Sequence, residues 1–235
     1  MSEVYAGFTD IHAHFLYGLD DGAEDRGGME AMLDAAHADG IASLFATPHV
    51  TPGIEPFDMA RYQEHLEEAR RYCRRKGYAL RLYSGAEILY TPALEQYALN
   101  HRLPTLAGSD YVLIEFMPDI SYRELELAAA HLERGGYIPV LAHVERYPCL
   151  YSRKHAAALK ERRNVRYQVN ANTVLSSGGF FHRRILQGWF RCGLVDFVAS
   201  DAHDCNRRPF RMRKAYDVLE RLYGQDEAMR LTGLE

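Results

Sequence analysis

The stretch Asp10-Ile-His12-Ala-His14 is the part of this sequence from which the fold can be worked out. It follows a short apolar segment and is therefore predicted to end a β-strand. Side chains alternate between the two faces of a strand, so His12 and His14 point the same way, as two ligands of one metal ion must. Imidazole is the commonest protein metal ligand. The pair predicts a metal site, although the pattern alone also fits two ordinary histidines.

The composition is typical of a globular protein with one large core. The 235 residues are 47% hydrophobic and 26% charged, and we expect a single domain over residues 1–235. A net charge of −4 gives no basic excess for nucleic-acid binding. No signal peptide or apolar run of about 18 residues is present, so no membrane insertion is expected. Scattered cysteines without a C-x-x-C pair predict reduced thiols and a cytoplasmic location: Cys73, Cys149, Cys192 and Cys205.

Apolar runs bounded by turn residues predict seven short strands that alternate with helices. The strands are predicted at residues 5–14, 41–46, 80–88, 111–116, 138–142, 165–169 and 197–199. Helices are predicted at residues 28–39, 59–76 (with Asp58 as N-cap and Gly77 after the last turn), 122–134, 153–163, 182–192 and 206–223, with a short one at the end of the chain. This alternation predicts a parallel sheet covered on both faces.

Histidine or acidic side chains recur at the C-terminal ends of six of the seven predicted strands. An open doubly wound sheet would gather its site at one switch point between strands. Only a closed or nearly closed barrel brings six strand ends around one centre. We therefore predict an α/β fold, a distorted (β/α)7 barrel similar to a TIM barrel.

Nine residues near the strand ends are candidate metal ligands: His12, His14, Asp21, His49, Glu87, Glu115, His143, Asp201 and His203. Burying Glu115 in its apolar strand without a partner would cost on the order of several kcal/mol, so a cation should lie nearby. Asp21 beside Gly22 also fits a turn residue, and His49 also fits an exposed loop histidine. A catalytic zinc ion takes about three protein ligands, so the set predicts two or three ions. Nitrogen and oxygen ligands without thiolates suit Mn²⁺, Fe or Zn.

Two arginines follow candidate ligands closely. Arg146 lies three residues past His143, and Arg208 lies five past His203. Guanidinium groups bind phosphate through two N–H groups at once, so both are candidate phosphate clamps, although arginine is abundant in this chain. The remaining histidines fall in or beside predicted helices and are interpreted as surface or packing residues: His37, His65, His101, His131, His155 and His182.

Seven motifs occur in order between about residues 8 and 210: Asp10-Ile-His12-Ala-His14, Gly18-Leu-Asp-Asp21-Gly, Thr47-Pro-His49, Gly85-Ala-Glu87, Leu113-Ile-Glu115-Phe, Ala142-His143-Val-Glu-Arg146 and Ser200-Asp201-Ala-His203. The set resembles the polymerase and histidinol phosphatase (PHP) superfamily. More narrowly, it resembles the bacterial manganese-dependent tyrosine-protein phosphatases that accompany capsule and exopolysaccharide synthesis. Tyr17, Val50 and Val144 replace residues usual in that family, and none of these differences removes a ligand. Tyr17 and Val50 change the expected rim of the site, which bears on substrate preference more than on metal binding.

The resemblance implies a PHP-type barrel holding three metal ions. One ion would be bound by His12, His14, Glu87 and Asp201. A second would be bound by Glu87, Glu115 and His143, and a third by Asp21, His49 and His203. The implied reaction is hydrolysis of phosphotyrosine on a bacterial tyrosine autokinase, with metal-activated water as the nucleophile and the two arginines neutralising phosphate charge.

Several other functions fit parts of the sequence. A small-molecule phosphatase, such as one acting on histidinol phosphate, would use the same metals. An amidohydrolase usually needs a carboxylated lysine, but every lysine falls in a predicted helix. Residues Cys205 to Arg211 match the C-x5-R pattern of cysteine phosphatases, although Pro209 lacks an N–H group and no glycine is present. A regulatory protein could keep the metals as structure only. The sequence does not specify an oligomeric state.

Overall fold

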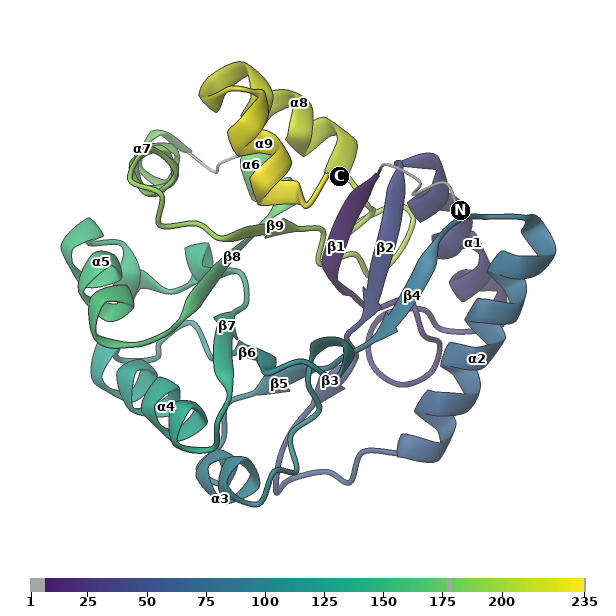
Figure 1. The fold of residues 1–235 in the computed structure, drawn as a ribbon, viewed down its shortest axis with the longest axis horizontal. Coiled ribbons are helices and arrows are strands. Elements are labelled where there is room, and N and C mark those ends of the chain that lie inside the picture. The colour runs from purple at the N-terminus through teal and green to yellow at the C-terminus, as the bar shows by residue number, and fades with distance from the viewer. Residues whose placement is uncertain (1–6, 177–178, 235) are drawn as a thin grey trace.

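The structure is a computed structural model that describes residues 7–176 and 179–234, and it shows a ring of strands surrounded by helices (Figure 1). Within these residues the strands are β1 (Phe8–Ala13), β2 (Ile41–Ala46), β3 (His49–Val50), β4 (Arg81–Ser84), β5 (Glu87–Leu89), β6 (Tyr111–Glu115), β7 (Ile138–Leu141), β8 (Arg166–Asn170) and β9 (Phe197–Ala199). All the pairings between neighbouring strands are parallel.

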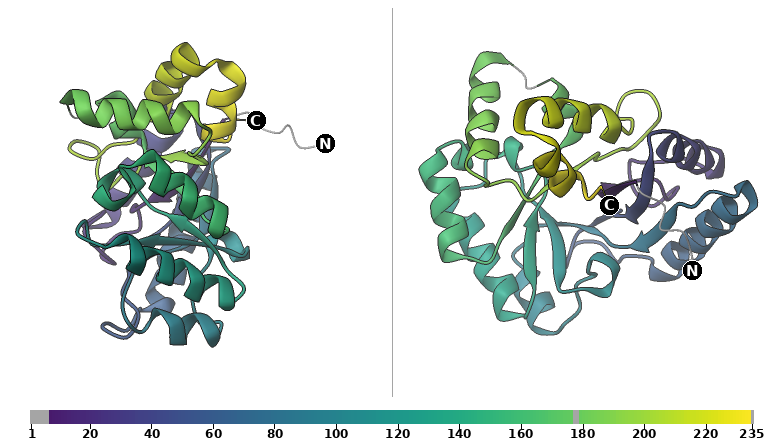
Figure 2. Two further views of the ribbon diagram at one scale, coloured as in Figure 1. Left: turned by 90° about the vertical axis from the view of Figure 1, so that its left-hand side faces the viewer. Right: turned by 45° about the horizontal axis from the view of Figure 1, so that its top comes forward.

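The helices lie outside the ring, as the two views of Figure 2 show. They are α1 (Arg26–Ala38), α2 (Met59–Lys76), α3 (Leu94–Leu99), α4 (Tyr122–Arg134), α5 (Arg153–Arg162), α6 (Ala171–Leu175), α7 (Gly179–Arg191), α8 (Met212–Tyr223) and α9 (Gln225–Thr232). The predicted ends of α2 are confirmed. The Asp58 carboxylate accepts the Arg61 N–H at 3.0 Å, and Gly77 ends the helix with a left-handed φ of 69°.

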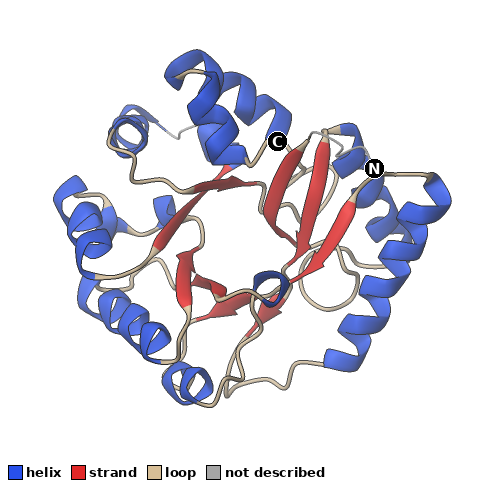
Figure 3. Cartoon of the chain, viewed as in Figure 1, coloured by secondary structure: helices blue, strands red, loops and turns tan. Residues whose placement is uncertain are grey.

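The strands close into a seven-membered barrel (Figure 3). One sheet contains three strands in the order β1-β2-β4, and the other contains six strands in the order β3-β5-β6-β7-β8-β9. The chain passes from β2 into β3 through Thr47-Pro48, and from β4 into β5 through Gly85-Ala86, so each of these pairs is one bent strand. The first and last strands meet where the His14 N–H donates to the Ala202 carbonyl at 2.8 Å. The predicted distorted (β/α)7 barrel is confirmed.

Two apolar cores hold this barrel together. The larger one packs the helices against the outer faces of the strands, with α2 contributing Leu66 and α4 contributing Leu132, both buried. The smaller one joins buried side chains of β1, β6, β7 and β9, including Ile11, Leu113 and Val140. Because these strands lie around the ring, their apolar side chains fill its inside below the strand ends.

Several predicted boundaries are wrong. The strand predicted at residues 80–88 is interrupted at Gly85, where an added Cβ would come within 2.9 Å of the Leu106 side chain. The helix predicted at residues 206–223 starts only at Met212. The Asp204 carboxylate accepts three backbone N–H groups of residues 206–208, and this holds the segment as a loop. The strand predicted at residues 5–14 begins outside the described residues.

The helices α3 and α6 were not predicted, and both are short. Among residues 7–176 and 179–234, no helix combines the length and the apolar character that a bilayer-spanning segment requires.

Candidate metal centre

The structure brings all nine predicted ligands together at the C-terminal end of the barrel strands. His12 lies on β1 and His14 directly follows it, while Asp21 comes from the loop between β1 and α1. The others lie on later strands or follow them: His49 on β3, Glu87 on β5, Glu115 at the end of β6, His143 after β7, and Asp201 and His203 after β9. Closure of the barrel therefore brings together residues that are as much as 191 positions apart in the sequence.

The most deeply buried group consists of His12, His14, Glu87 and Asp201, each at most 2% exposed. Their ligand atoms all lie within 4.8 Å of one another. The Nε2 atoms of His12 and His14 lie 3.0 and 3.3 Å from the same Glu87 oxygen. Asp201 Oδ1 lies 3.5 Å from His12 Nε2. These four side chains can surround a single ion, as the family resemblance implies.

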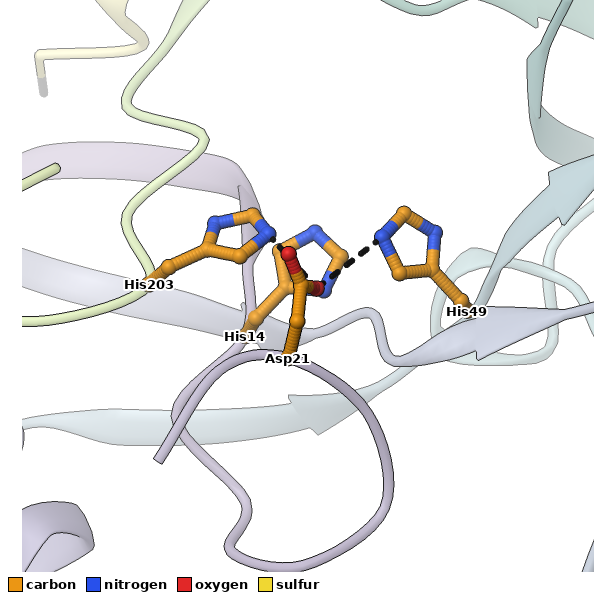
Figure 4. A group of neighbouring side chains, drawn as sticks. All are labelled: His14, Asp21, His49 and His203. Atoms are coloured by element: carbon orange, nitrogen blue, oxygen red, sulfur yellow. Dashed lines mark ion pairs between the residues drawn. The ribbon is translucent and has the colours of Figure 1, made fainter. Parts of the chain in front are cut away.

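A second group, His14, Asp21, His49 and His203, lies nearer the opening of the barrel (Figure 4). Asp21 Oδ1 lies 3.3 Å from His203 Nε2 and 3.4 Å from His49 Nε2. The His14 and His203 rings stack with centroids 3.8 Å apart. The Asp21 side chain is 65% exposed, so an ion held here would be reachable from solvent.

The third group is His49, Glu87 and Glu115, with His143 beside it. His49 Nδ1 lies 3.0 Å from Glu115 and 3.3 Å from Glu87. His143 Nε2 lies 2.9 Å from Glu87 Oε1 and 3.6 Å from Glu115 Oε2. Glu87 therefore adjoins two groups, as a bridging carboxylate would. The three-ion partition implied by the resemblance is not unique here, because His14 and His49 each lie within reach of two groups.

The donor set fits divalent cations. Five carboxylates (Asp20, Asp21, Glu87, Glu115 and Asp201) and only two guanidinium groups (Arg146 and Arg208) surround the centre. While the imidazoles are neutral, this leaves a formal charge of −3 in a largely buried site. His49 Nδ1 and His203 Nε2 are also buried without a hydrogen-bond partner. Metal coordination would satisfy both nitrogens and compensate the charge.

The electrostatics of the protein alone point the same way. Burial by itself would lower the pKa of His12, yet the Glu87 and Asp201 carboxylates raise it to about 9. The pKa of His49 is likewise raised to about 9, against the effect of burial, by Glu115 and Glu87. Burial and the neighbouring His14 lower the pKa of His203 to about 4, so this imidazole is neutral at pH 7. In the absence of cations, protonated imidazoles take over the charge compensation.

Polar residues that the sequence did not single out orient the ligands. Gln168 Oε1 accepts the His143 N–H at 2.8 Å and lies 3.2 Å from His12 Nδ1. Asp20 Oδ2 lies 2.7 Å from His14 Nδ1, and Asn170 Nδ2 donates to Asp201 at 2.7 Å. Such partners fix the tautomer and direction of metal ligands. The available signal was the pair of polar residues Gln168 and Asn170 on one face of β8, which alternate with the apolar residues Tyr167 and Val169.

The backbone is also constrained at two of the ligands. His143 has a φ of 32° and Asp201 a φ of 54°, in the left-handed region that costs a non-glycine residue about 1–3 kcal/mol. In both cases the left-handed residue is the second one after the end of a strand, where the chain leaves the barrel. Local strain of this kind is characteristic of functional sites.

Both predicted phosphate clamps lie at the edge of the centre. Arg146 Nη2 donates to Asp201 Oδ2 at 2.7 Å, and Arg208 Nη2 donates to Asp201 Oδ1 at 2.8 Å. Their side chains are 43% and 37% exposed, so part of each guanidinium group is open to solvent. Arg208 Nη1 also lies 3.6 Å from Asp21 Oδ2. A pocket of about 420 Å³ adjoins Asp21 and His49 and leads away toward α2.

The structure argues against the cysteine-phosphatase interpretation. A phosphate loop needs free backbone N–H groups, but the Asp204 carboxylate already accepts those of residues 206–208. Burial raises the pKa of Cys205, whereas a nucleophilic cysteine needs a lowered one. The amidohydrolase interpretation also lacks its lysine, because all four lysines lie in helices: Lys76, Lys154, Lys160 and Lys214.

Comparison with known proteins agrees with this geometry. The family model for capsular polysaccharide synthesis proteins CpsB/CapC matches residues 8–233. Tyrosine-protein phosphatase CpsB of Streptococcus pneumoniae is 30% identical over 228 residues, covering 94% of this chain and 93% of that protein. Tyrosine-protein phosphatase YwqE of Bacillus subtilis is 32% identical over 232 residues, covering 95% and 88%.

Solved structures give the same result. A chain from the crystal structures of YwqE and CpsB, described as unique metal-dependent tyrosine phosphatases, superposes with a TM-score of 0.85 at 31% identity, covering 96% of this chain and 91% of that one. A histidinol phosphate phosphatase from Lactococcus lactis, 12% identical with a TM-score of 0.57, shares the fold. The resemblance found in the sequence motifs is thus confirmed, and the chain belongs to the CpsB/CapC family of capsular polysaccharide synthesis proteins.

Proposed function

We propose that this chain is a metal-dependent tyrosine-protein phosphatase. The observation that carries the proposal is the buried cluster of His12, His14, Glu87 and Asp201, with two half-exposed guanidinium groups attached to its Asp201. The tyrosine phosphatases CpsB and YwqE match nearly the whole chain, which supports this choice among phosphatases. We assign the activity to one domain over residues 1–235.

We propose that the nine predicted ligands bind two or three ions, with Mn²⁺ as the native metal and Fe or Zn as alternatives. All the donor atoms of this set are nitrogen or oxygen, which suits these metals. When bound, such ions lower the pKa of water to about 7 and neutralise charge on a phosphoryl group. The described residues need supply no nucleophile of their own, which agrees with the unfavourable position of Cys205.

The side chains around the ligands hold and orient the phosphoryl group. Arg146 uses Nη2 on Asp201, and Arg208 uses Nη2 on Asp201 while its Nη1 lies 3.6 Å from Asp21 Oδ2. We propose that the remaining N–H groups of the two forks bind phosphoryl oxygens. Asp201 thereby links the ligand cluster to both clamps. A tyrosine phenolate has a pKa of about 10 and leaves more readily than a serine alkoxide, which suits a site without a dedicated general acid.

The proposed physiological substrate is a phosphotyrosine-bearing bacterial tyrosine kinase that controls capsule or exopolysaccharide synthesis, in the cytoplasm. Membership of a capsular polysaccharide synthesis family supports this partner. Neither nucleic acid nor membrane insertion is part of the proposal, in keeping with the net charge of −4.

The test is phosphate release from a phosphotyrosine peptide, a phosphoserine peptide and histidinol phosphate, each with added Mn²⁺ and again with EDTA. We expect Mn²⁺-dependent release from phosphotyrosine alone. Preference for histidinol phosphate would retain the metal centre but assign the chain to small-molecule metabolism. Activity that survives EDTA would contradict the metal assignment itself.

A further inference from the structure

The loop that carries Asp21 is closed on itself after β1. The Ala23 N–H donates to the His14 carbonyl at 3.1 Å, and the Gly18 N–H donates to the Ala23 carbonyl at 2.9 Å. Gly22 lies so close to His14 that an added Cβ would come within 2.0 Å of its carbonyl oxygen. The loop therefore forms a compact unit directly beside the ligands, visible below Asp21 in Figure 4.

The inner side of this loop is attached to the metal centre through Asp20. Its Oδ2 lies 2.7 Å from His14 Nδ1 and accepts the His49 N–H at 3.1 Å. Its Oδ1 accepts the Gly22 N–H at 2.9 Å. The position of the loop thus affects two ligands besides Asp21, because a shift of Asp20 would turn His14 and move His49.

The outer side of the loop is held by α2 through Tyr17. The Tyr17 ring stacks on the His65 ring with centroids 3.7 Å apart and planes 15° from parallel. The Tyr17 hydroxyl donates to Glu68 Oε2 at 2.9 Å. His65 Nδ1 lies 3.0 Å from the Tyr17 carbonyl, and because a carbonyl only accepts, this nitrogen carries the proton. His65 and Glu68 are three residues apart and so share one face of α2.

We propose that Tyr17, His65 and Glu68 form a positioning clamp that fixes the Asp20–Asp21 loop for metal binding. His65 is buried, with 5% exposure, and both of its contacts described above are made with Tyr17, the residue that begins the turn toward Asp20. None of the three clamp residues is a ligand. The inference rests on the proposed metal centre, but it concerns how tightly the ions bind rather than which substrate is hydrolysed.

The chain contains a matched control for this clamp. Tyr78 stacks on His37 with centroids 3.9 Å apart and planes 14° from parallel, and its hydroxyl donates to Asp34 at 2.9 Å. The two stacks have the same chemistry. Tyr78 follows the far end of α2, and at 1.5 Å per residue that end lies about 17 Å from His65. Disrupting it removes similar contacts without touching the loop.

The experiment compares Tyr17→Leu, Tyr17→Phe and Tyr78→Leu with the full wild-type chain. Mn²⁺ binding is measured by titration calorimetry on metal-free protein, and thermal unfolding is measured in EDTA. We expect Tyr17→Leu to weaken Mn²⁺ binding at one or more sites by about tenfold, the scale of loss when an outer partner of a ligand is removed. Tyr17→Phe keeps the ring stack and should recover part of this affinity. Tyr78→Leu should lower the unfolding temperature comparably and leave Mn²⁺ affinity unchanged.

Two results would overturn the clamp. One is wild-type Mn²⁺ affinity in Tyr17→Leu, and the other is an equal loss of affinity in Tyr78→Leu, which would reduce the effect to general stability. A shifted Mn²⁺ isotherm for Tyr17→Leu in a chain that hydrolyses no phosphotyrosine would support the clamp and refute the proposed function. Phosphatase rates at limiting and saturating Mn²⁺ add a second readout, since excess metal should restore most of the Tyr17→Leu rate.

Discussion

Replacing Gln168 with Leu should damage the metal centre without touching a ligand. Gln168 is fully buried on β8, and its Oε1 accepts the His143 N–H at 2.8 Å while facing His12 Nδ1 at 3.2 Å. Leucine is close in size to glutamine and offers no acceptor, so both donors would be left buried and unpaired. At about 1–3 kcal/mol for each orphaned donor, the unfolding free energy should fall by about 2–6 kcal/mol.

The same change should loosen the ligands themselves. Gln168 fixes the tautomer of His12 by accepting from Nδ1, which presents Nε2 to the centre. It also holds the strained backbone of His143, whose φ is 32°. Loss of such an outer partner typically costs about 10–100-fold in metal affinity. We therefore expect a corresponding rise in the Mn²⁺ concentration needed for half-maximal phosphotyrosine hydrolysis.

Tyr167→Phe is the control for stability alone. Tyr167 is the neighbouring residue on β8, is equally buried, and donates its hydroxyl to the Ala156 carbonyl at 2.8 Å, toward α5 rather than the centre. It should destabilise the chain but leave Mn²⁺ dependence intact. Unfolding in EDTA and hydrolysis across a Mn²⁺ series would be measured for both variants. Equal Mn²⁺ dependence in Gln168→Leu and Tyr167→Phe would refute the proposed role of Gln168.

Three further outcomes are expected. His143→Ala and Asp201→Ala should each reduce phosphotyrosine hydrolysis by more than about 100-fold, because losing a ligand should cost more than losing a residue that merely orients one, for which about 100-fold is the upper limit. Circular dichroism should show an intact fold in both variants. Full activity in either would contradict the ligand assignment. Cys205→Ser should keep the rate within about twofold, because exposed substitutions change free energies by less than about 0.5 kcal/mol, and a dead variant would revive the cysteine mechanism. The pKa of His12 is raised from 6.5 to about 9 in the folded chain, so its stabilisation is complete below pH 6.5 and disappears as the pH rises through 9. Thermal unfolding in EDTA should accordingly show a falling midpoint over this range, which added Mn²⁺ should largely abolish; a flat EDTA profile would be inconsistent with a charged His12.

Local sequence patterns predicted those parts of the fold that depend on local causes. The strand at residues 41–46 and the helix at residues 122–134 have the predicted bounds, because an apolar run and a Ser121 capping box specify them directly. The break within residues 80–88 depends instead on how Gly85 packs against Leu106, and the late start of α8 on which N–H groups Asp204 accepts. Neither of these two contacts can be inferred from the hydrophobic periodicity of the segment itself.

The convergence of the nine predicted ligands could be predicted from the sequence, whereas the residues that orient them could not. Each predicted ligand is a histidine or acid at a strand end or, for Asp21, in the loop after a strand, and barrel closure brings them together. Gln168 lies 156 positions from His12 in sequence, and Asn170 lies 31 from Asp201. An amide has no chemical preference for metals, so only the three-dimensional partner identifies its role. The residues that orient the ligands are identified by their contacts in the folded chain rather than by their residue type.

For a related reason, the sequence does not specify which ligand would bind which ion. The resemblance assigns His14 to a single ion, but in the folded chain His14 Nε2 lies 3.3 Å from Glu87 in the buried group, and His14 also belongs to the group of Asp21 and His203. Glu87 likewise approaches His49 and His143 with different oxygens, at 3.3 and 2.9 Å. Differences of a few tenths of an ångström in such distances decide which ion a shared ligand serves. They depend on loops such as the one carrying Asp21, and therefore on contacts as remote from the ions as the stack of Tyr17 on His65.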